Sequence, residues 1–415
     1  MHVKNSTIIT LAAATIITLS GFAGCKSNEP KVATNPERIG QLASAKNADQ
    51  RSNQVNSDKL QIFAAIKGPM PTGVAVSKEN RVFTNFPRWG DPVEYTVAEI
   101  KDGKAVPFPS KELNDSTGDL SKNLFAVQSV VVDDQDRLWA LDTGSVNFTP
   151  PKANAPKLVA IDLKNNQIVK TIHFKPDVCL PTTYLNDVRF DLKRGREGMA
   201  FITDSSQSGP NGIIVVDLAS GDAWRRLNNH PSTKAEPNFT PIVEGEPLMS
   251  RMPGQPAAYI KIGSDGIAIS KDKKTLFYCP LAGHHLYSVS VDALADRDKS
   301  DQDAAATVKD LGDRGYASDG LETGPDGSIY LTDYERNAIH VRDSNGQNDR
   351  VLVSDPRMIW PDTLSASGTD GFLYFTANQL NRQKQFHNGK DQRVQPYAIF
   401  RFPIQGGRTA TALAR

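Results

Sequence analysis

A short pattern that recurs six times constrains the fold of this chain more than any other feature. Each copy consists of a strand, a tight polar turn and a second strand that carries an aromatic residue. The aromatics are Phe83, Trp139, Phe201, Phe277, Tyr330 and Tyr374, and they follow one another at intervals of 44 to 76 residues. An interval of this length accommodates one four-stranded antiparallel sheet together with its loops.

Strands bounded by Gly, Pro, Asn and Asp dominate the sequence, and no long helical periodicity interrupts them. Four-stranded sheets repeated around an axis form a propeller, which leaves few exposed edges. Two stacked sandwiches would not require an aromatic at the same point of six hairpins. We therefore predict an all-β fold, a six-bladed β-propeller over residues 60–415, in which residues 399–404 close the ring against residues 60–66.

The first 25 residues have the features of a bacterial lipoprotein signal peptide. Lys4 precedes an apolar run over residues 8–19, which is too short to span a bilayer stably. Small residues then precede Cys25, as in a lipobox, although Phe22 stands where Leu is usual. We expect lipidation at Cys25; simple cleavage near Ala23 is the alternative.

Residues 26–59 are polar and contain too few apolar side chains to offset the entropy of ordering. We expect them to form a tether between a lipid bilayer, reached through the N-terminal acyl anchor, and the propeller. The predicted location is outside the cytoplasm, as a periplasmic or cell-surface lipoprotein. Lys26 is not an acidic retention signal, which favours the outer membrane; without lipidation the chain would be secreted.

Charge and cysteine content narrow the classes of partner. The chain has 48 Lys and Arg against 47 Asp and Glu, and its basic residues are scattered, so we expect no nucleic-acid partner. Apart from Cys25, only Cys179 and Cys279 are present. An oxidising compartment permits a bridge between them. The alternative is a buried thiol at Cys279 and a loop thiol at Cys179.

Polar residues open the first strand of every predicted blade. Since these strands line the channel of a propeller, the residues should meet at one mouth; in chain order they are Thr72, Gln128, Asn186 with Asp187, Asp265, Asp319 and Asp362. Converging carboxylates must be protonated, hydrogen-bonded or neutralised by a cation. Their hard oxygens suit Ca²⁺ or another divalent cation, with Asn186, Asp265 and Asp319 as candidate ligands. The alternative is that the aspartates cap backbone N–H groups at the strand entries.

Aromatic and basic side chains lie next to these acids in the sequence. Arg88 and Trp89 follow the second strand of blade one, and Trp360 precedes Asp362. Such groups bind aromatic or cationic ligands by stacking and cation–π contact. The predicted ligand-binding set is therefore Arg88, Trp89, Asn186, Asp187, Asp265, Asp319, Trp360 and Asp362; loop packing by Trp89 and Trp360 is the alternative.

Other polar residues are interpreted as structural. Asp142, Asp204 and Asp333 each follow a repeat aromatic by three residues, and this repetition indicates turn acids rather than catalysts. The pair His284 and His285 is interpreted as a solvated turn, because adjacent strand residues point to opposite faces. We find no nucleotide-binding, nucleophile-elbow or zinc signature.

Several blocks of the sequence resemble the yellow/major royal jelly protein family in their order along the chain. They include RVFTNFPRW at 81–89, RLWALDTG at 137–144, PKLVAIDL at 156–163, YLNDV at 184–188, GIIVVDL at 212–218 and WPDT at 360–363. The resemblance covers nearly the whole predicted propeller and suggests a bacterial member. It implies a secreted six-bladed propeller with a small-molecule pocket at one channel mouth. Insect members are linked to melanin-pathway chemistry and to the binding of aromatic amines.

The fold implied by this family also resembles the gluconolactonase propellers, which are metal-dependent hydrolases. Asn186, Asp265 and Asp319 fall roughly where those enzymes hold a metal, but Thr72 stands where they place a glutamate. Fold likeness alone carries no activity. The leading prediction is a small-molecule-binding propeller, with or without an isomerase-type activity. The alternatives are a metal-dependent lactonase, with Asp265 or Asp319 near the water, and a partner-binding surface protein.

Overall fold

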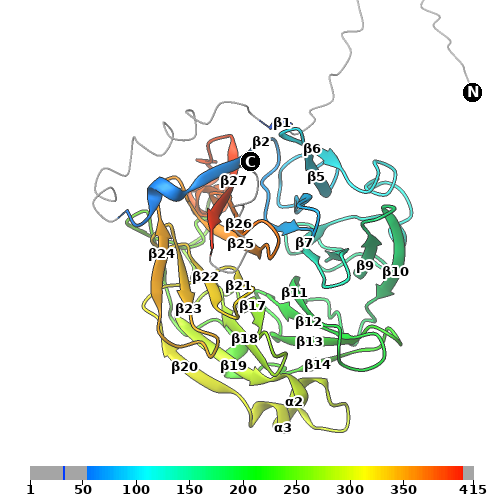
Figure 1. Cartoon of the computed structure of the whole chain (residues 1–415). Coiled ribbons are helices and arrows are strands. Elements are labelled where there is room, and N and C mark those ends of the chain that lie inside the picture. The colour runs from blue at the N-terminus through cyan, green and yellow to red at the C-terminus, as the bar shows by residue number, and fades with distance from the viewer. Residues whose placement is uncertain (1–30, 33–53, 405–415) are drawn as a thin grey trace, which may run out of the picture.

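The protein folds as a ring of six four-stranded antiparallel sheets around a common axis, as the computed structural model shows (Figure 1). The structure describes residues 31–32 and 54–404. The chain passes from one blade to the next in sequence order, and each blade begins with its innermost strand. The predicted all-β, six-bladed propeller is confirmed.

Blades one to three follow the order of the predicted hairpins. Blade one contains β3 (Val74–Val76), β4 (Val82–Asn85), β5 (Val97–Lys101) and β6 (Lys104–Pro107). Blade two contains β7 (Val127–Val132), β8 (Arg137–Asp142), β9 (Lys157–Asp162) and β10 (Gln167–His173). Blade three contains β11 (Leu185–Asp191), β12 (Met199–Asp204), β13 (Gly212–Asp217) and β14 (Ala223–Arg226).

Blades four to six complete the ring. Blade four contains β17 (Ser264–Ile269), β18 (Thr275–Pro280), β19 (His285–Ser290) and β20 (Lys309–Asp313), with helices α2 (Val291–Ala295) and α3 (Asp301–Ala305) at its outer rim (Figure 1). Blade five contains β21 (Leu321–Thr323), β22 (Ile329–Asp333), β23 (Ala338–Arg342) and β24 (Arg350–Ser354). Blade six contains β25 (Pro361–Ala366), β26 (Phe372–Ala377), β27 (Tyr397–Pro403) and, from the other end of the domain, β2 (Gln61–Lys67).

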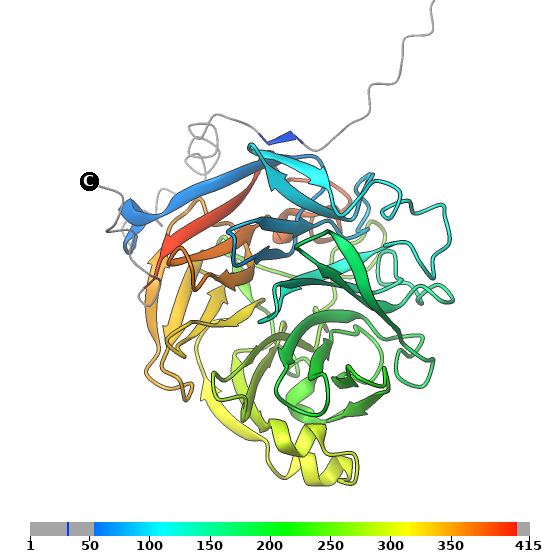
Figure 2. The same ribbon diagram turned by 45° about the vertical axis from the view of Figure 1, so that its right-hand side comes forward.

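Ring closure joins the two ends of the propeller. β2 pairs antiparallel with β27, with Ile66 opposite Tyr397 and Ile62 opposite Phe400. Figure 2 shows this blue strand beside the red one. The predicted closure by residues 399–404 is confirmed, and it makes the last blade depend on both ends of the domain. A two-residue strand, β1 (Lys31–Val32), adds to the outer edge of β2.

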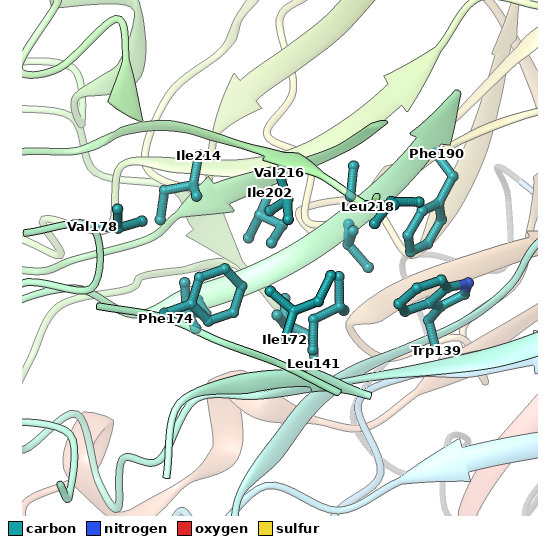
Figure 3. Packing of buried hydrophobic residues seen from close by; sticks show 14 of the residues in the cluster. Trp139, Leu141, Ile172, Phe174, Val178, Phe190, Ile202, Ile214, Val216 and Leu218 are labelled. Carbon is teal, nitrogen blue, oxygen red and sulfur yellow. The ribbon is translucent and has the colours of Figure 1, made fainter. Parts of the chain in front are cut away.

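The repeat aromatics are buried where one blade packs on the next. All six lie on the second strands of their blades and are almost fully buried. In the core between blades two and three, Trp139 of β8 stacks on Phe190 of β11, with ring centroids 4.9 Å apart (Figure 3). Full burial of a large side chain stabilises a fold by about 1.5–3 kcal/mol, which explains why every blade carries one.

The N-terminal segment meets the propeller before the first strand of the ring. The predicted signal peptide, its Cys25 and most of the predicted tether 26–59 lie outside the described residues. Within the described part of the tether, Val55 pairs with Ser354 at the edge of β24, and a short 3-10 turn, Ser57–Lys59, follows. Among the described helices, none is long and apolar enough to cross a membrane.

The two cysteines are unpaired. Cys279 is fully buried on β18, and Cys179 packs in the core between blades two and three, so the bridge considered above does not form. The alternative is confirmed: Cys279 is a buried thiol on a strand, and Cys179 lies in a loop, where its side chain is also buried. Its loop folds onto the apolar faces of β9 and β12, and desolvation raises the pKa of its thiol to about 12.

The residues interpreted as turn acids are structural. Asp142, at the end of β8, is fully buried and accepts hydrogen bonds from the backbone N–H groups of Phe125 (2.7 Å) and Ala126 (3.0 Å). Asp204 and Asp333 bind backbone N–H groups in the same way.

The histidine pair is less solvated than expected. His284 is half-buried, packs edge-on against Phe239 and hydrogen-bonds Glu335 at 2.7 Å. Phe239 comes from the long connection between blades three and four, so the sequence around His284 could not predict this contact.

Candidate functional site

The acids that open successive blades meet around the axis. Asn186 on β11, Asp265 on β17, Asp319 just before β21 and Asp362 on β25 all line one cavity of about 590 Å³ at one end of the channel, here called the mouth cavity. The Nδ2 of Asn186 donates to Oδ1 of Asp265 at 2.6 Å. These four residues form the floor of the mouth cavity.

Each floor carboxyl is held by donors from its own blade or a neighbouring one. Ser205 donates to Oδ2 of Asp265 at 3.1 Å, and Asn378 donates to Oδ2 of Asp362 at 2.6 Å. The indole N–H of Trp360 donates to Oδ2 of Asp319 at 2.7 Å. The side chains of Asp265 and Asp319 are themselves hydrogen-bonded to each other. The floor is therefore a connected polar network in which each carboxyl is fixed.

Burial controls the protonation of the floor. Desolvation raises the pKa of Asp265 and of Asp362 well above its ordinary value, and the nearby Asp319 adds to both shifts. Desolvation also raises the pKa of Asp319, to about 6, while hydrogen bonds from Trp360 and Asp265 oppose the rise. The hydrogen bond between the two side chains favours the protonated form of Asp265 and the ionised form of Asp319.

Trp360 does not line the mouth cavity but holds one carboxyl of its floor. Its ring is fully buried and stacks on Tyr334, with centroids 4.1 Å apart and an interplanar angle of 11°. Its backbone adopts a left-handed φ of 56°, which is rare for a bulky residue. A strained backbone of this kind costs about 1–3 kcal/mol and is typically found at functional sites. Here the strained conformation aims the indole N–H at Asp319.

Aromatic rings form one wall of the mouth cavity. Trp89 and Phe148 line it and stack on each other at 5.4 Å, and Phe148 stacks on the buried Tyr184 at 4.1 Å. The indole N–H of Trp89 donates to the hydroxyl of Tyr184 at 2.7 Å, and that hydroxyl donates to Gln128 at 3.0 Å. The hydrogen bonds fix the rings, so the wall presents a flat, preorganised surface.

The rim comes from two connections rather than from blades. The first is the segment 248–262 between blades three and four, and the second is the β26–β27 connection with its 3-10 turns Leu380–Arg382 and Lys384–Phe386. The Arg382 guanidinium forms a bidentate ion pair with Glu244, which lies just before the first segment, and the backbone N–H of Arg251 within that segment donates to the carbonyl of Gln385 at 2.7 Å. These bonds tie the two connections together.

The sequence profile of the family described as “Major royal jelly protein” matches residues 125–405. The chain belongs to the major royal jelly protein family. Major royal jelly protein 1 of Apis mellifera is 26% identical over 235 residues, covering 54% of this chain and 51% of that protein. A yellow-related salivary protein of Lutzomyia longipalpis is 26% identical over 341 residues (74% and 77%). Dopaminechrome tautomerase of Drosophila melanogaster is 26% identical over 305 residues (67% and 61%).

This royal jelly family member spans about half the length, or less, of the royal jelly proteins 1, 7 and 3 of the honeybee (51%, 43% and 36%). Among solved structures, it is similar to a putative gluconolactonase, with a TM-score of 0.51 and 11% identity over 84% of this chain and 93% of that one. A regucalcin of Agrobacterium tumefaciens, described as a calcium-binding protein, has a TM-score of 0.50 and 13% identity (83% and 93%). Likeness at these identities shows the fold alone.

The floor of this royal jelly family member fits a divalent cation only in part. Asn186 donates its N–H group to Asp265, which leaves its amide oxygen available to a cation, but the side chains of Asp265 and Asp319 are already hydrogen-bonded to each other. Thr72, in the blade-one position, donates its hydroxyl to the carbonyl of Gln128. Among the described residues, no three His, Cys, Asp or Glu side chains are arranged to hold a metal ion.

Three of the predicted ligand-binding residues do not line the mouth cavity. The Arg88 guanidinium turns away from it and donates to the carbonyls of Phe125 (2.6 Å) and Val93 (3.0 Å). Trp360 is buried behind Asp319, to which its indole N–H donates. Asp187 points along the channel to Arg189, because neighbouring strand residues alternate in direction.

Arg189 divides the channel of this protein into two chambers. It binds both oxygens of Asp187 at 2.9 Å and reaches the carbonyl of Leu321 in blade five at 2.5 Å. A separate cavity of about 320 Å³, lined by Arg189 and Glu322, lies at the other end of the channel. The mouth cavity is therefore a pocket that is closed at its base, not a through tunnel.

Sequence reasoning missed the residues that loops bring to the cavity. Phe148 lies in the β8–β9 loop, and Met252 and Tyr259 lie in segment 248–262. One signal was present: the interval of 76 residues between Phe201 and Phe277 is the longest between repeat aromatics and reveals an insertion at this point. No periodicity indicates which of its side chains face the site.

Proposed function

We propose that this protein binds a small aromatic molecule in the mouth cavity, with the ring of the ligand against Trp89 and Phe148 and its polar group at the acidic floor. The observation that carries the proposal is that a preorganised aromatic wall and three buried carboxyls line the same 590 Å³ cavity. A cavity of this size suits a small organic ligand.

Charge favours a ligand with an amine or another cationic group. Asp265, Asp319 and Asp362 line the floor, where a bound cation would favour the ionised form of each carboxyl, whereas Lys261 at the rim is the one cation among the described residues that line the cavity. A cation placed between a carboxylate and an aromatic face gains both Coulomb and cation–π stabilisation, the latter worth about 0.5–2 kcal/mol. The aromatic-amine chemistry implied by the family resemblance agrees with this charge distribution.

The hydrogen-bonded pair of Asp265 and Asp319 suits proton transfer within a bound ligand. Asp319 would take a proton from a ligand carbon while Asp265 gives one to a ligand oxygen or nitrogen. The ligand then has the same atoms and charge but is a different tautomer. A proton passing back through the hydrogen bond of the pair restores the starting state. The name of one relative, dopaminechrome tautomerase, supplies the first probe for such a reaction.

The test uses the purified full-length protein with dopamine in isothermal titration calorimetry and dopaminechrome in an absorbance assay. We expect dopamine to bind, Trp89→Ala to weaken binding about 10-fold through lost stacking, and Asp319→Asn to abolish dopaminechrome conversion. The control is Asp326→Asn in the exposed β21–β22 turn. Absence of dopamine binding up to about 1 mM would refute the binding proposal; binding without conversion would refute only the tautomerase activity.

A metal-dependent lactonase is the second candidate. It is favoured by one observation, the meeting of Asn186, Asp265 and Asp319 at one floor. When bound there, a divalent cation would polarise a lactone carbonyl and activate water. Metal analysis of the purified protein, and lactone turnover before and after chelation, test this candidate. We expect any metal at this floor to be lost in the Asp265→Ala/Asp319→Ala double variant; an unchanged metal content would place the metal elsewhere.

We also propose that the chain is exported and anchored by a lipid at Cys25. Lys26, which is not an acidic retention signal, favours the outer membrane over the inner one. Metabolic labelling with a radioactive fatty acid tests the anchor. Label should appear in the native chain and disappear in Cys25→Ser. Equal labelling of both would contradict the anchor, whereas export of an unlabelled protein would indicate simple secretion.

A further inference from the structure

Large apolar side chains are exposed in few places on this protein, and the rim of the mouth cavity is one of them. Among the described residues they are Ile168 and Val169 on β10, and Ile242, Met252 and Tyr259 in the connection between blades three and four. Met252 (43% exposed) and Tyr259 (44% exposed) also line the mouth cavity. Exposed apolar side chains that gather at a cavity mark an interaction site more often than isolated ones do.

The rim holds these side chains in place. Ser250 and Ala258 pair through two backbone hydrogen bonds of 2.9 and 3.0 Å, which close a small loop that contains Met252. Two backbone hydrogen bonds of Arg251 fix the loop to the β26–β27 connection. The N–H of Arg251 donates to the carbonyl of Gln385 at 2.7 Å, and the N–H of Asn388 donates to the carbonyl of Arg251 at 2.9 Å. The exposure of Met252 and Tyr259 is therefore built into an anchored segment.

Tyr259 differs from the residues of the aromatic wall in its contacts. Trp89, Phe148 and Tyr184 stack on one another and satisfy their polar atoms internally. Within the described part of the chain, Tyr259 has no ring partner and its hydroxyl has no hydrogen bond. Packing in the protein therefore does not account for its position at the cavity.

We propose that Met252 and Tyr259 are specificity-determining residues that the ligand covers when it binds. The inference rests on the proposed function and defines the class of ligand more narrowly. A molecule that satisfies both ends of the cavity has a polar or cationic group for the floor and an apolar or aromatic body for the rim. The class is thus amphipathic, and a sugar lactone with hydroxyls on every face fits it poorly.

The chemistry of the two residues suits this role. A Tyr ring offers a flat face at the cost of fixing only two side-chain torsions, so it binds aromatic bodies without a large entropy penalty. A Met side chain is flexible and polarisable, and it adapts to ligands of different shape. Ligand binding would remove both side chains from water, which adds apolar burial to the contacts at the floor.

Ile242 provides a matched control. It is an apolar residue of the same connection and is 48% exposed, but it does not line the mouth cavity. Substitution of Ile242 by Ala therefore removes a similar exposed surface without touching the proposed contact. Because all three side chains are exposed, each Ala variant is expected to keep the melting temperature of the parent within about 2 °C.

The experiment measures dopamine binding by calorimetry in the full-length protein and in Tyr259→Ala, Met252→Ala and Ile242→Ala, together with hydrogen exchange in segment 250–262. We expect Tyr259→Ala to weaken binding roughly 3- to 10-fold and Met252→Ala about 3-fold, in line with the loss of one stacking or sulfur contact. Ile242→Ala should bind as the parent does, and exchange in the segment should slow when dopamine is present.

The outcomes separate this inference from the proposed function. If dopamine binds the parent and all three variants equally and exchange is unchanged, the rim is not a contact and the inference is wrong, while the proposed function stands. If the parent itself does not bind dopamine, the proposed function fails first. If light scattering instead shows a dimer that both Tyr259→Ala and Ile242→Ala dissociate, the rim is a protein interface and the inference is overturned.

Discussion

A buried ion pair at the base of the β8–β9 loop gives the sharpest test of how this fold holds its site. Asp142 ends β8, Lys157 begins β9, and the two residues are paired in register. The Nζ of Lys157 donates to Oδ2 of Asp142 at 2.8 Å and to the carbonyls of Leu120 and Ala155 at 3.0 and 3.1 Å, and both side chains are fully buried. The loop that they close carries Phe148 of the aromatic wall.

We predict that Lys157→Met destabilises the protein strongly. All three hydrogen bonds of the ammonium group are lost, and Asp142 remains as a buried charge without its counterion. Removing one member of a buried pair costs about 3–5 kcal/mol, which is a large part of a typical stability of about 5–15 kcal/mol. The rate of amide hydrogen exchange in residues 143–156 should also rise, because the ion pair no longer closes the base of the loop.

The assay is denaturant unfolding of the parent, Lys157→Met, Asp142→Ala and the double variant. Because the two residues interact directly, the double variant should cost at least about 2 kcal/mol less than the sum of the single variants. Lys164→Met, in the exposed β9–β10 turn, serves as the control and should change stability by less than about 0.5 kcal/mol. A loss below about 1 kcal/mol for Lys157→Met, or additive costs in the cycle, would refute the reasoning.

Three further predictions concern protonation and thiols. Trp360→Phe keeps the stack on Tyr334 but removes the N–H donor to Asp319. The pKa of the Asp319 carboxyl, followed by carbon NMR, should therefore rise by about one unit, equivalent to about 1.4 kcal/mol. An unchanged pKa would show that the indole N–H does not stabilise the carboxylate. Burial lowers the pKa of His340, but hydrogen bonds to Asp333 and Asp349 outweigh it and raise the pKa above the ordinary value. The stability that protonated His340 contributes is therefore complete below the unfolded-state pKa of about 6.5 and is lost as the pH rises through the folded-state pKa. Across this pH range the melting temperature should fall more in the parent than in His340→Gln. Equal falls in the two proteins would contradict the assignment. Burial raises the pKa of the Cys279 thiol to about 11, so in a Cys25→Ser/Cys179→Ser variant this thiol should react with an aromatic disulfide reagent only after unfolding. Fast labelling of that variant in its native state would contradict the burial of Cys279.

The propeller and the floor of its site could be predicted from the sequence because both follow from strand periodicity. Six similar hairpins require six similar sheets, and an aromatic at the same point of each hairpin fills the gap between blades. Residues that open innermost strands must then meet at the axis, which is why Asn186, Asp265, Asp319 and Asp362 share one cavity.

Tertiary structure alone decided which neighbouring side chains reach the ligand cavity. Arg88 and Trp89 are adjacent, yet only Trp89 lines the cavity, and Trp360, whose backbone is left-handed, is fully buried and reaches only Asp319 of the floor. Phe148 and Tyr259 come from loops, where side-chain direction has no period and depends on contacts with distant segments. A repeating backbone determines where strands begin, whereas the direction of each loop residue depends on packing that only the complete fold provides.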